Sequence, residues 1–151
     1  MADVGFGGLA PTTPLRLDVK DPQPDALARY RFVMHGRDRL LQCETHEGWV
    51  DCYRMMESDP AFIDYEMANW WVATHPGAFL RQHLLVSRST PRGRLTLFDD
   101  TLSLRTGAAS APQEQRLGAR TQIAEALADE FGLAIEAADL DAVMRVLEPA
   151  A

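Results

Sequence analysis

The chain has 151 residues, of which 46% are hydrophobic and 25% are charged, and its formal net charge at pH 7 is −7. This balance is typical of a folded globular protein and unlike that of a disordered chain. The acidic charge argues against a general nucleic-acid binder, which needs a basic surface. No secretory signal and no apolar run of roughly 18–20 residues is found, so we expect a cytoplasmic protein with no membrane partner.

Short alternating segments separated by turn residues predict an antiparallel meander in the first part of the chain. The predicted strands are residues 29–34, 40–45 and 49–55, with turns at 35–38 and 46–48. A helix is predicted over residues 63–74. It should end there because Pro76 disfavours helical backbone at the residue before it.

A second group of strands and then two helices are predicted for the rest of the chain. The strands are residues 80–87, 94–98 and 102–104, and the stretch 107–118, rich in Ala, Ser, Pro and Gln, is predicted to be a loop. One helix repeats apolar residues every four positions and stops at Gly132, which suits a C-terminal cap. Asp139 is predicted to cap a final amphipathic helix.

The two cysteines, Cys43 and Cys52, are predicted to be core residues. Their spacing around His46, Cys43-x2-His46-x5-Cys52, matches no common zinc motif. Strand alternation places Leu41 with Cys43 on one face and Val50 with Cys52 on one face. Small buried thiols are common in cores, so we expect no metal site, and no disulfide in a cytosolic protein.

The chain opens on the residues Asp-Val-Gly-Phe-Gly-Gly at 3–8, which read as the end of a strand entering a glycine turn. This segment, with residues 12–17, closely resembles the Asp-Val-Gly-Phe-Gly segment of arylamine N-acetyltransferases. Residues 63–79, including Asn-Trp-Trp-Val-Ala-Thr-His-Pro at 69–76, and the helix at 122–132 are similar to that family's segments in the same order. The resemblance therefore extends from residue 3 to residue 132.

The chain also departs from the family's pattern. The family's Arg-Gly-Gly-x-Cys-x-Glu segment and its histidine, which precede the Asp-Val-Gly-Phe-Gly segment, are not found here, and residues 52–56 are less polar than in relatives. By motif, neither Cys43 nor Cys52 replaces the missing nucleophile. We therefore expect a truncated enzyme that is inactive as this chain alone.

The resemblance implies ping-pong acetyl transfer by a Cys-His-Asp triad. A cysteine thiolate takes the acetyl group from acetyl-CoA and passes it to an arylamine, hydrazine or arylhydroxylamine. A histidinium partner lowers the thiol pKa, and a carboxylate orients the imidazole. Asp3 is the only residue onto which a catalytic role carries over, and its alternative interpretation is a solvated terminal acid.

The resemblance also implies binding residues for coenzyme A and for the arylamine. The implied cofactor-binding residues are Gly5, Phe6, Gly7, Thr74, His75 and Arg81. The implied substrate-binding residues are Phe6 and Phe79. Without the resemblance, the turn, His75 and Phe79 would be interpreted as an ordinary tight turn, a helix end and a core residue.

One feature supports a phosphate-bearing cofactor independently of the resemblance. No Asp or Glu occurs between Met67 and Phe98, a stretch that contains four arginines: Arg81, Arg88, Arg92 and Arg94. Local positive charge inside an acidic protein suits the phosphates of coenzyme A. The alternative is a solvated basic strand face.

Together these observations predict an α+β chain. The expected architecture is a partial antiparallel β-barrel domain (1–58), then a β-sheet lid domain with C-terminal helices (59–151), the rear part of a cysteine-proteinase-like acetyltransferase fold. The alternative function is a non-catalytic CoA- or aryl-ligand-binding module, or a half-protein that assembles with a separate N-terminal chain. Because the family's barrel begins upstream, we expect an unpaired strand edge at residues 9–17 or their neighbours, and self-association or a need for the missing half.

Overall fold

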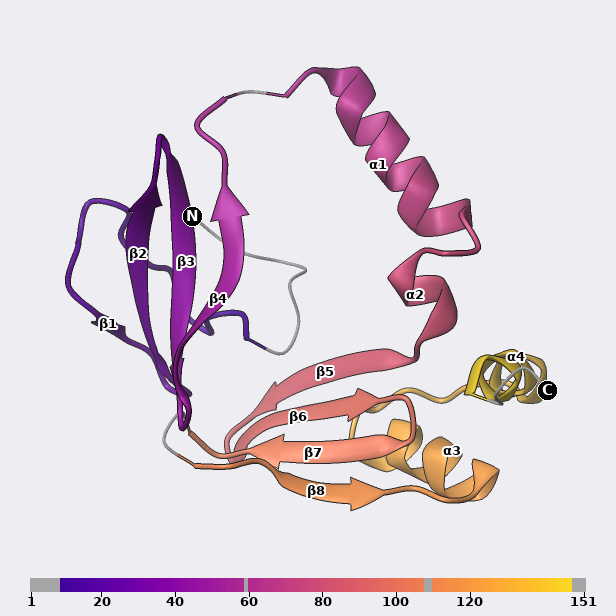
Figure 1. The fold of residues 1–151 in the computed structure, drawn as a ribbon. Coiled ribbons are helices and arrows are strands. Elements are labelled where there is room, and N and C mark those ends of the chain that lie inside the picture. Colours follow the sequence, from indigo (N-terminus) through magenta and orange to yellow (C-terminus); the bar gives the residue numbers. More distant parts are fainter. Residues whose placement is uncertain (1–8, 59, 108–109, 148–151) are drawn as a thin grey trace. The chain divides into compact units, whose positions relative to one another are not determined.

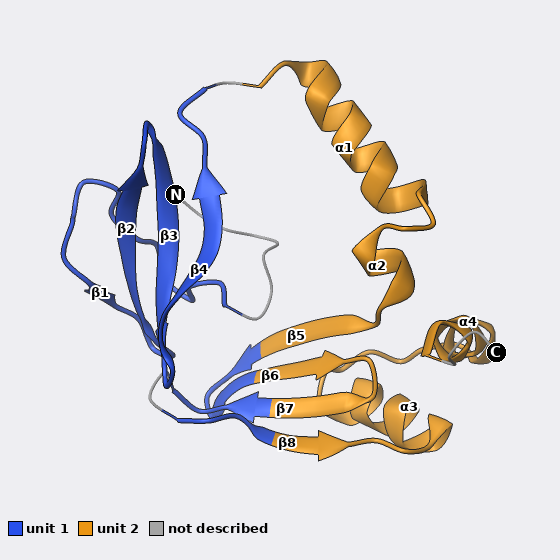
Figure 2. Cartoon of the chain, in the orientation of Figure 1, with its two compact units in different colours: residues 1–59, 89–94, 104–113 blue, residues 60–88, 95–103, 114–151 orange. Residues whose placement is uncertain are grey.

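The structure is a computed structural model that describes residues 9–58, 60–107 and 110–147 (Figure 1). Its contacts divide the chain into two compact units (Figure 2). Unit 1 comprises residues 1–59, 89–94 and 104–113, and unit 2 comprises residues 60–88, 95–103 and 114–151. A domain boundary between residues 58 and 59 stays a prediction. Two short stretches from later in the chain, residues 89–94 and 104–113, group with unit 1.

Unit 1 contains the first sheet, which is an antiparallel meander as predicted. Its strands, in spatial order, are β1 (Gln23–Pro24), β2 (Arg29–His35), β3 (Asp38–Thr45) and β4 (Gly48–Met55). Two-residue turns close the hairpins, with His35 paired to Asp38 and Thr45 paired to Gly48. Gly36 occupies the left-handed region in the first turn, at φ 65°.

Strand alternation builds the core of unit 1 on one face of this sheet. Tyr30 and Phe32 on β2 and Leu41 and Cys43 on β3 are all buried, and Leu15 joins them from the preceding segment. Neighbouring residues on each strand point away from this cluster, as a pleated strand requires. The prediction that Leu41 and Cys43 share a buried face is confirmed.

Asp25 holds the segment before β1 in place. Its Oδ2 accepts hydrogen bonds at 2.8–2.9 Å from the backbone and hydroxyl groups of Thr12 and Thr13, and its Oδ1 accepts one from the Leu27 amide at 3.2 Å. Burial alone would raise the pKa of Asp25, but these bonds outweigh it and lower the pKa. The stabilisation from Asp25 is therefore present above its unfolded pKa and is lost as the pH falls through the lower folded value.

The unpaired strand edge expected at residues 9–17 or their neighbours does not lie at residues 9–17, because these form turns and irregular structure; the edge strands of the first sheet are β1 and β4. The hydrogen bonds of this segment go instead to side chains. In addition to the Asp25 contacts, the amide of Arg16 donates to Gln23 Oε1, and Gln23 Nε2 donates back to the Arg16 carbonyl, both at 2.8 Å. Side-chain acceptors thus satisfy backbone groups that a strand would pair with a neighbour.

The second sheet has the order β5 (Leu85–Thr90), β6 (Gly93–Phe98), β7 (Thr101–Arg105) and β8 (Gln113–Arg116). Successive strands run in opposite directions (Figure 1). The predictions for β6 and β7 are confirmed. The strand predicted over 80–87 is wrong at its start, where a short helix, α2 (Phe79–Gln82), replaces it. The predicted loop at 107–118 contains β8, whose four residues are all exposed and so give no alternating signal.

The remaining helices belong to unit 2. Helix α1 (Phe62–Thr74) ends where predicted, since His75 is extended. Helix α3 (Arg120–Asp129) buries Ile123, Ala126 and Leu127 and ends at a glycine cap: Gly132 has φ 72° and its amide donates to the Ala128 carbonyl. Helix α4 (Ala137–Leu147) begins earlier than predicted, so Asp139 lies in its first turn and is not its N-cap.

Both sheets are open in the part of the chain that the structure describes, so the predicted barrel is not confirmed. Among those residues, no helix is both long enough and apolar enough to cross a membrane. The described residues also include no group of three or more His, Cys, Asp or Glu side chains placed to hold a metal ion.

Replacing Gly93 by Ala should destabilise the second sheet strongly. Gly93 has φ 143°, and a Cβ there would lie 2.2 Å from the backbone oxygen of Arg105. We expect the free energy of unfolding in urea to fall by about 2–4 kcal/mol from strain and overlap together. The matched control is Gly36→Ala, which also has a positive φ but open space around it, and it should cost about 1 kcal/mol. Equal losses for both variants would contradict the close approach at Gly93.

Candidate functional site

The structure describes only some of the predicted site residues. Asp3, Gly5, Phe6 and Gly7 lie outside the described residues. The other predicted site residues lie in unit 2, at the corner between α1 and α2: Thr74, His75, Phe79 and Arg81.

The end of α1 fixes the first two of these residues. The Thr74 hydroxyl donates to the Trp70 carbonyl at 2.6 Å, back along the helix. The His75 ring stacks on Trp71 with centroids 3.5 Å apart and planes 12° apart. The Gly77 amide donates to His75 Nδ1 at 3.1 Å, so the proton of the neutral imidazole sits on Nε2. The corner therefore presents an oriented imidazole.

Arg81 joins the same corner from α2. Its Nη1 donates to the Ala73 carbonyl at 3.2 Å, which satisfies an acceptor in the last turn of α1 and places a positive charge at the negative end of that helix. Phe79, at the start of α2, is 52% exposed and its ring lies 4.6 Å from that of His83. Thr74, His75 and Arg81 are thus brought together, with Phe79 close in sequence.

The other arginines of the acid-free segment have different surroundings. Arg88 Nη1 donates to the Glu130 carbonyl at the end of α3, at 3.1 Å. Arg94 is 7% exposed and its Nη2 donates to the Ser89 hydroxyl at 3.2 Å. Arg81 and Arg88 belong to unit 2, whereas Arg92 and Arg94 belong to unit 1. The four arginines therefore do not form one basic surface within a single unit.

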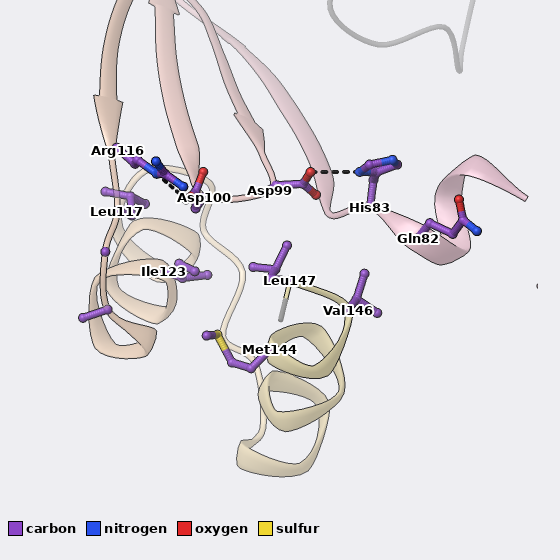
Figure 3. A pocket seen from close by; sticks show the side chains of 12 residues that line it. Gln82, His83, Asp99, Asp100, Arg116, Leu117, Ile123, Met144, Val146 and Leu147 are labelled. Atoms are coloured by element: carbon purple, nitrogen blue, oxygen red, sulfur yellow. Dashed lines mark hydrogen bonds and ion pairs between the residues drawn. The ribbon is translucent and has the colours of Figure 1, made fainter. Parts of the chain in front are cut away.

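A pocket of about 550 Å³ lies next to the α2 end of this region, within unit 2 (Figure 3). On one side, His83 Nδ1 and Asp99 Oδ2 form a hydrogen-bonded pair at 2.8 Å. On another side, Arg116 Nε donates to Asp100 Oδ2 at 2.6 Å, and this bond holds the pKa of Asp100 below its usual value. An apolar group from α3 and α4 completes the lining: Ile123, Met144, Val146 and Leu147.

Backbone hydrogen bonds and ring contacts hold the His83–Asp99 pair in position. Asp99 occupies the left-handed region at φ 52°, in the turn between β6 and β7. The Leu84 amide donates to its Oδ1 at 3.0 Å, and the Asp99 amide donates to the Leu84 carbonyl at 2.8 Å. The His83 ring also packs against the rings of Phe79 and Phe98, with centroids at 4.6 and 5.2 Å. Three contacts therefore fix this imidazole.

The pocket can bind and orient a ligand, but its lining lacks a nucleophile. The His83–Asp99 pair has the form of the base and orienting acid of a catalytic triad. The residues that line the pocket, all within the described part of the chain, include no Ser, Thr, Cys or Lys. Sequence reasoning identified the turn at Asp99 and Asp100 but missed His83, which is 16 residues away in the chain and joined to Asp99 only by folding.

The comparisons with known proteins agree with one family. An N-acetyltransferase family model matches residues 1–140. The chain belongs to the arylamine N-acetyltransferase family. It is 30% identical over 149 residues to the arylamine N-acetyltransferase of Mycolicibacterium smegmatis, covering 98% of this chain and 54% of that protein. It is 40% identical over 98 residues to the arylamine N-acetyltransferase of Escherichia coli, covering 64% of this chain and 35% of that protein.

Solved structures of the family share the fold. The structure of Mycobacterium marinum arylamine N-acetyltransferase in complex with CoA is similar at a TM-score of 0.82 and 27% identity, covering 97% of this chain and 54% of that one. The Mycobacterium tuberculosis arylamine N-acetyltransferase gives a TM-score of 0.83 at 27% identity, over 95% of this chain and 54% of that one. The chain thus spans about half the length of these arylamine N-acetyltransferases.

Asp99 should stabilise the fold mainly as a hydrogen-bond acceptor and less through its charge. Replacing Asp99 by Ala removes the acceptors for Leu84 and His83 and leaves a residue that disfavours the left-handed backbone, so we expect a loss of about 2–3 kcal/mol of unfolding free energy. Asp99→Asn keeps one acceptor and tolerates that backbone, and it should cost about 1 kcal/mol or less. Urea titrations of both variants test this, and equal losses would contradict it.

Proposed function

We propose that this chain is the C-terminal portion of an arylamine N-acetyltransferase, which transfers acetyl from acetyl-CoA to an arylamine, hydrazine or arylhydroxylamine. The observation that carries the proposal is the family match over residues 1–140, which includes the Asp-Val-Gly-Phe-Gly segment at 3–7. The comparisons to relatives favour this enzyme over a non-catalytic binding module, because they extend along most of the chain.

In this proposal, Asp3 is the third member of a Cys-His-Asp triad. Its carboxylate accepts a hydrogen bond from the histidine, holds the imidazole in the productive orientation and stabilises its charged form. The thiolate so favoured takes the acetyl group and then releases it to the amine, which is the ping-pong order of events. The cysteine and histidine are proposed to come from the half of the enzyme that this chain does not match. On that basis, the chain by itself does not turn over.

We propose further that residues 1–58 belong to a β-barrel domain and residues 59–151 to a lid domain, as in a cysteine-proteinase-like fold. The open meander of β1 to β4 supports this, because its edge strands have backbone groups available for pairing. The separate sheet and the helices of unit 2 support a second domain.

The α1–α2 corner is the proposed contribution of the described residues to coenzyme A binding. The solved Mycobacterium marinum relative is in complex with CoA, which supports a CoA site in this family. Arg81 is suited to a phosphate because its guanidinium has five donors and one bond to Ala73 leaves others for a ligand. Thr74 and His75 would line the same site, together with the turn formed by Gly5, Phe6 and Gly7. Phe6 and Phe79 are the proposed arylamine contacts.

Coenzyme A binding should depend on at least one arginine of the acid-free segment, with Arg81 the first candidate. In Arg81→Gln, losing a charge-assisted bond to phosphate should weaken coenzyme A binding by about 1.5–3 kcal/mol. Added salt should also weaken coenzyme A binding to the unsubstituted protein. Titration calorimetry with coenzyme A measures both effects. Arg29→Gln is the matched control, because Arg29 pairs with Glu44 in the first sheet. No binding, or no effect of substitution at Arg81, Arg88, Arg92 or Arg94, would remove the cofactor role from this segment.

Helix α1 provides the proposed contact with the other half of such an enzyme. None of its residues is buried, and four of its large apolar side chains are 56–75% exposed: Phe62, Ile63, Met67 and Trp70. Contiguous apolar surface of this kind is rare on a free soluble protein and marks an interaction site. Because the chain spans about half of its relatives, we propose that their N-terminal half covers α1. Self-association through α1 is the competing outcome.

Substituting the exposed apolar residues of α1 should weaken association without unfolding the chain. Met67→Ser with Trp70→Ser should change the unfolding free energy by only about 0.5 kcal/mol, because these side chains are 65% and 61% exposed. The double variant should bind the N-terminal half of the Mycolicibacterium smegmatis relative less tightly by calorimetry, whereas Glu66→Gln, on the same helix, should bind normally. Unchanged binding would sink the proposal, and a loss of dimers by light scattering would favour self-association instead.

A further inference from the structure

The two cysteines come together in the first sheet. Cys43 on β3 pairs with Val50 on β4, and Cys52 lies two residues further along β4. A residue and the diagonal neighbour of its cross-strand partner lie on the same face of an antiparallel pair, within reach of each other. Cys43 belongs to the core cluster of unit 1, and Cys52 packs against that cluster. Both thiols are free.

An irregularity in the strand pairing occurs at Cys52. Leu41 pairs with Tyr53 and the next residue, Gln42, pairs with Asp51, so Cys52 has no direct cross-strand partner. This is the pattern of a β-bulge, in which an extra residue on one strand changes the direction of its side chain. The bulge is compatible with the packing of Cys52 against the core cluster that contains Cys43, while the flanking strand pairs are kept.

Each of the two thiols affects the ionisation of the other, and their surroundings favour the negative charge on Cys43. The neighbouring Cys52 thiol, opposed by burial and helped by the Tyr30 hydroxyl, lowers the pKa of Cys43 to about 7. Cys43 in turn raises the pKa of Cys52. The charged side chains that act on the pair come from three segments: Asp51, Arg94 and Arg105. The two arginines favour the thiolate and Asp51 opposes it.

The two thiols differ in access to solvent. Cys43 is 1% exposed, whereas Cys52 is only partly buried. A soluble reagent therefore reaches Cys52 first, and Cys43 stands behind it as the second thiol. A partly exposed thiol beside a buried one is an arrangement in which the second thiol can convert a mixed disulfide into an internal disulfide.

We propose that Cys43 and Cys52 form an oxidisable dithiol that closes to an internal disulfide when a small-molecule disulfide such as glutathione disulfide is supplied. Cys52, the accessible thiol, passes its proton to the Cys43 thiolate and attacks one sulfur of the reagent, whose S–S bond breaks. The leaving glutathione thiolate takes up the proton from Cys43 and departs as one glutathione. The Cys43 thiolate then attacks Cys52 Sγ, the mixed disulfide breaks, and the second glutathione leaves. The chain loses two hydrogens and two electrons, and one glutathione disulfide becomes two glutathiones.

The sequence alone predicts no disulfide, on the ground that cytosolic thiols are kept reduced. That argument concerns the compartment, whereas the structure places Cys52 diagonally from Cys43 across one hairpin and packs it against the same core cluster. Diagonal neighbours on one face of an antiparallel pair are close enough for their side chains to meet. The bond would link two adjacent strands of the same sheet, so the fold of unit 1 can be retained.

The test is to incubate the folded chain with defined ratios of glutathione disulfide to glutathione and to quench it with an alkylating reagent. Intact mass should decrease by two hydrogens, no thiol should remain to be alkylated, and digestion should yield one peptide pair joining Cys43 to Cys52. Two alkylated thiols at every ratio, a glutathione adduct that persists on Cys52, or a disulfide-linked dimer would each overturn the proposal.

Single substitutions assign the order of the two steps. Cys43→Ser should stop the reaction at one glutathione on Cys52. Cys52→Ser should leave Cys43 unmodified for as long as the chain stays folded, since its sulfur is buried. If Cys43→Ser does not fold, the unchanged chain still decides the matter by its mass and its joined peptides. Rapid modification of Cys43 in folded Cys52→Ser would contradict the assigned order.

Discussion

The register of the β2–β3–β4 meander is the constraint on which the rest of unit 1 depends. Two-residue turns pair His35 with Asp38 and Thr45 with Gly48, and they leave little freedom for the strands to slip. A slip of one residue would turn Leu41 out of the core, because the side-chain period of a strand is two. The same register sets Cys43 diagonally from Cys52.

Residues 10–16, which precede this meander, are held by side chains and not by strand pairing. Asp25 accepts the amides and hydroxyls of Thr12 and Thr13, and the Tyr30 hydroxyl donates to the Ala10 carbonyl at 3.2 Å. A carboxylate that accepts several hydrogen bonds holds a loop firmly while its pKa stays low. Residues 10–13 are thus tied to Asp25 and to Tyr30 on the buried face of the meander.

In unit 2, hydrogen bonds of two arginines and an aspartate join the helices and the second sheet. Arg81 and Arg88 each donate to a carbonyl at the end of a helix, α1 and α3 respectively. Asp99 joins the β6–β7 turn to Leu84 and His83. These bonds connect residues far apart in sequence and set the geometry of the α1–α2 corner and of the pocket. Charged side chains that already hold helix ends are pre-positioned for an anionic ligand.

Most elements with a strong local signal were predictable from the sequence. The alternation of Tyr30 with Phe32, and the turn glycines, located the first sheet, and Gly132 located the end of α3. Where the local signal is weak, prediction failed: β8 is polar on both faces, and α2 is a single turn. The His83–Asp99 pair also escaped prediction, because only tertiary structure brings these two residues together.

The most direct test of the account is an acetylation assay with and without the N-terminal half of the Mycolicibacterium smegmatis relative. With acetyl-CoA and an arylamine, the chain alone should give no product, and the mixture should give acetylated amine. Asp3→Ala should lower the rate of the mixture by about 10⁴-fold, as loss of the orienting acid does in other triads, while the two parts still associate. Turnover by the chain alone, or full activity of the Asp3→Ala mixture, would contradict the account.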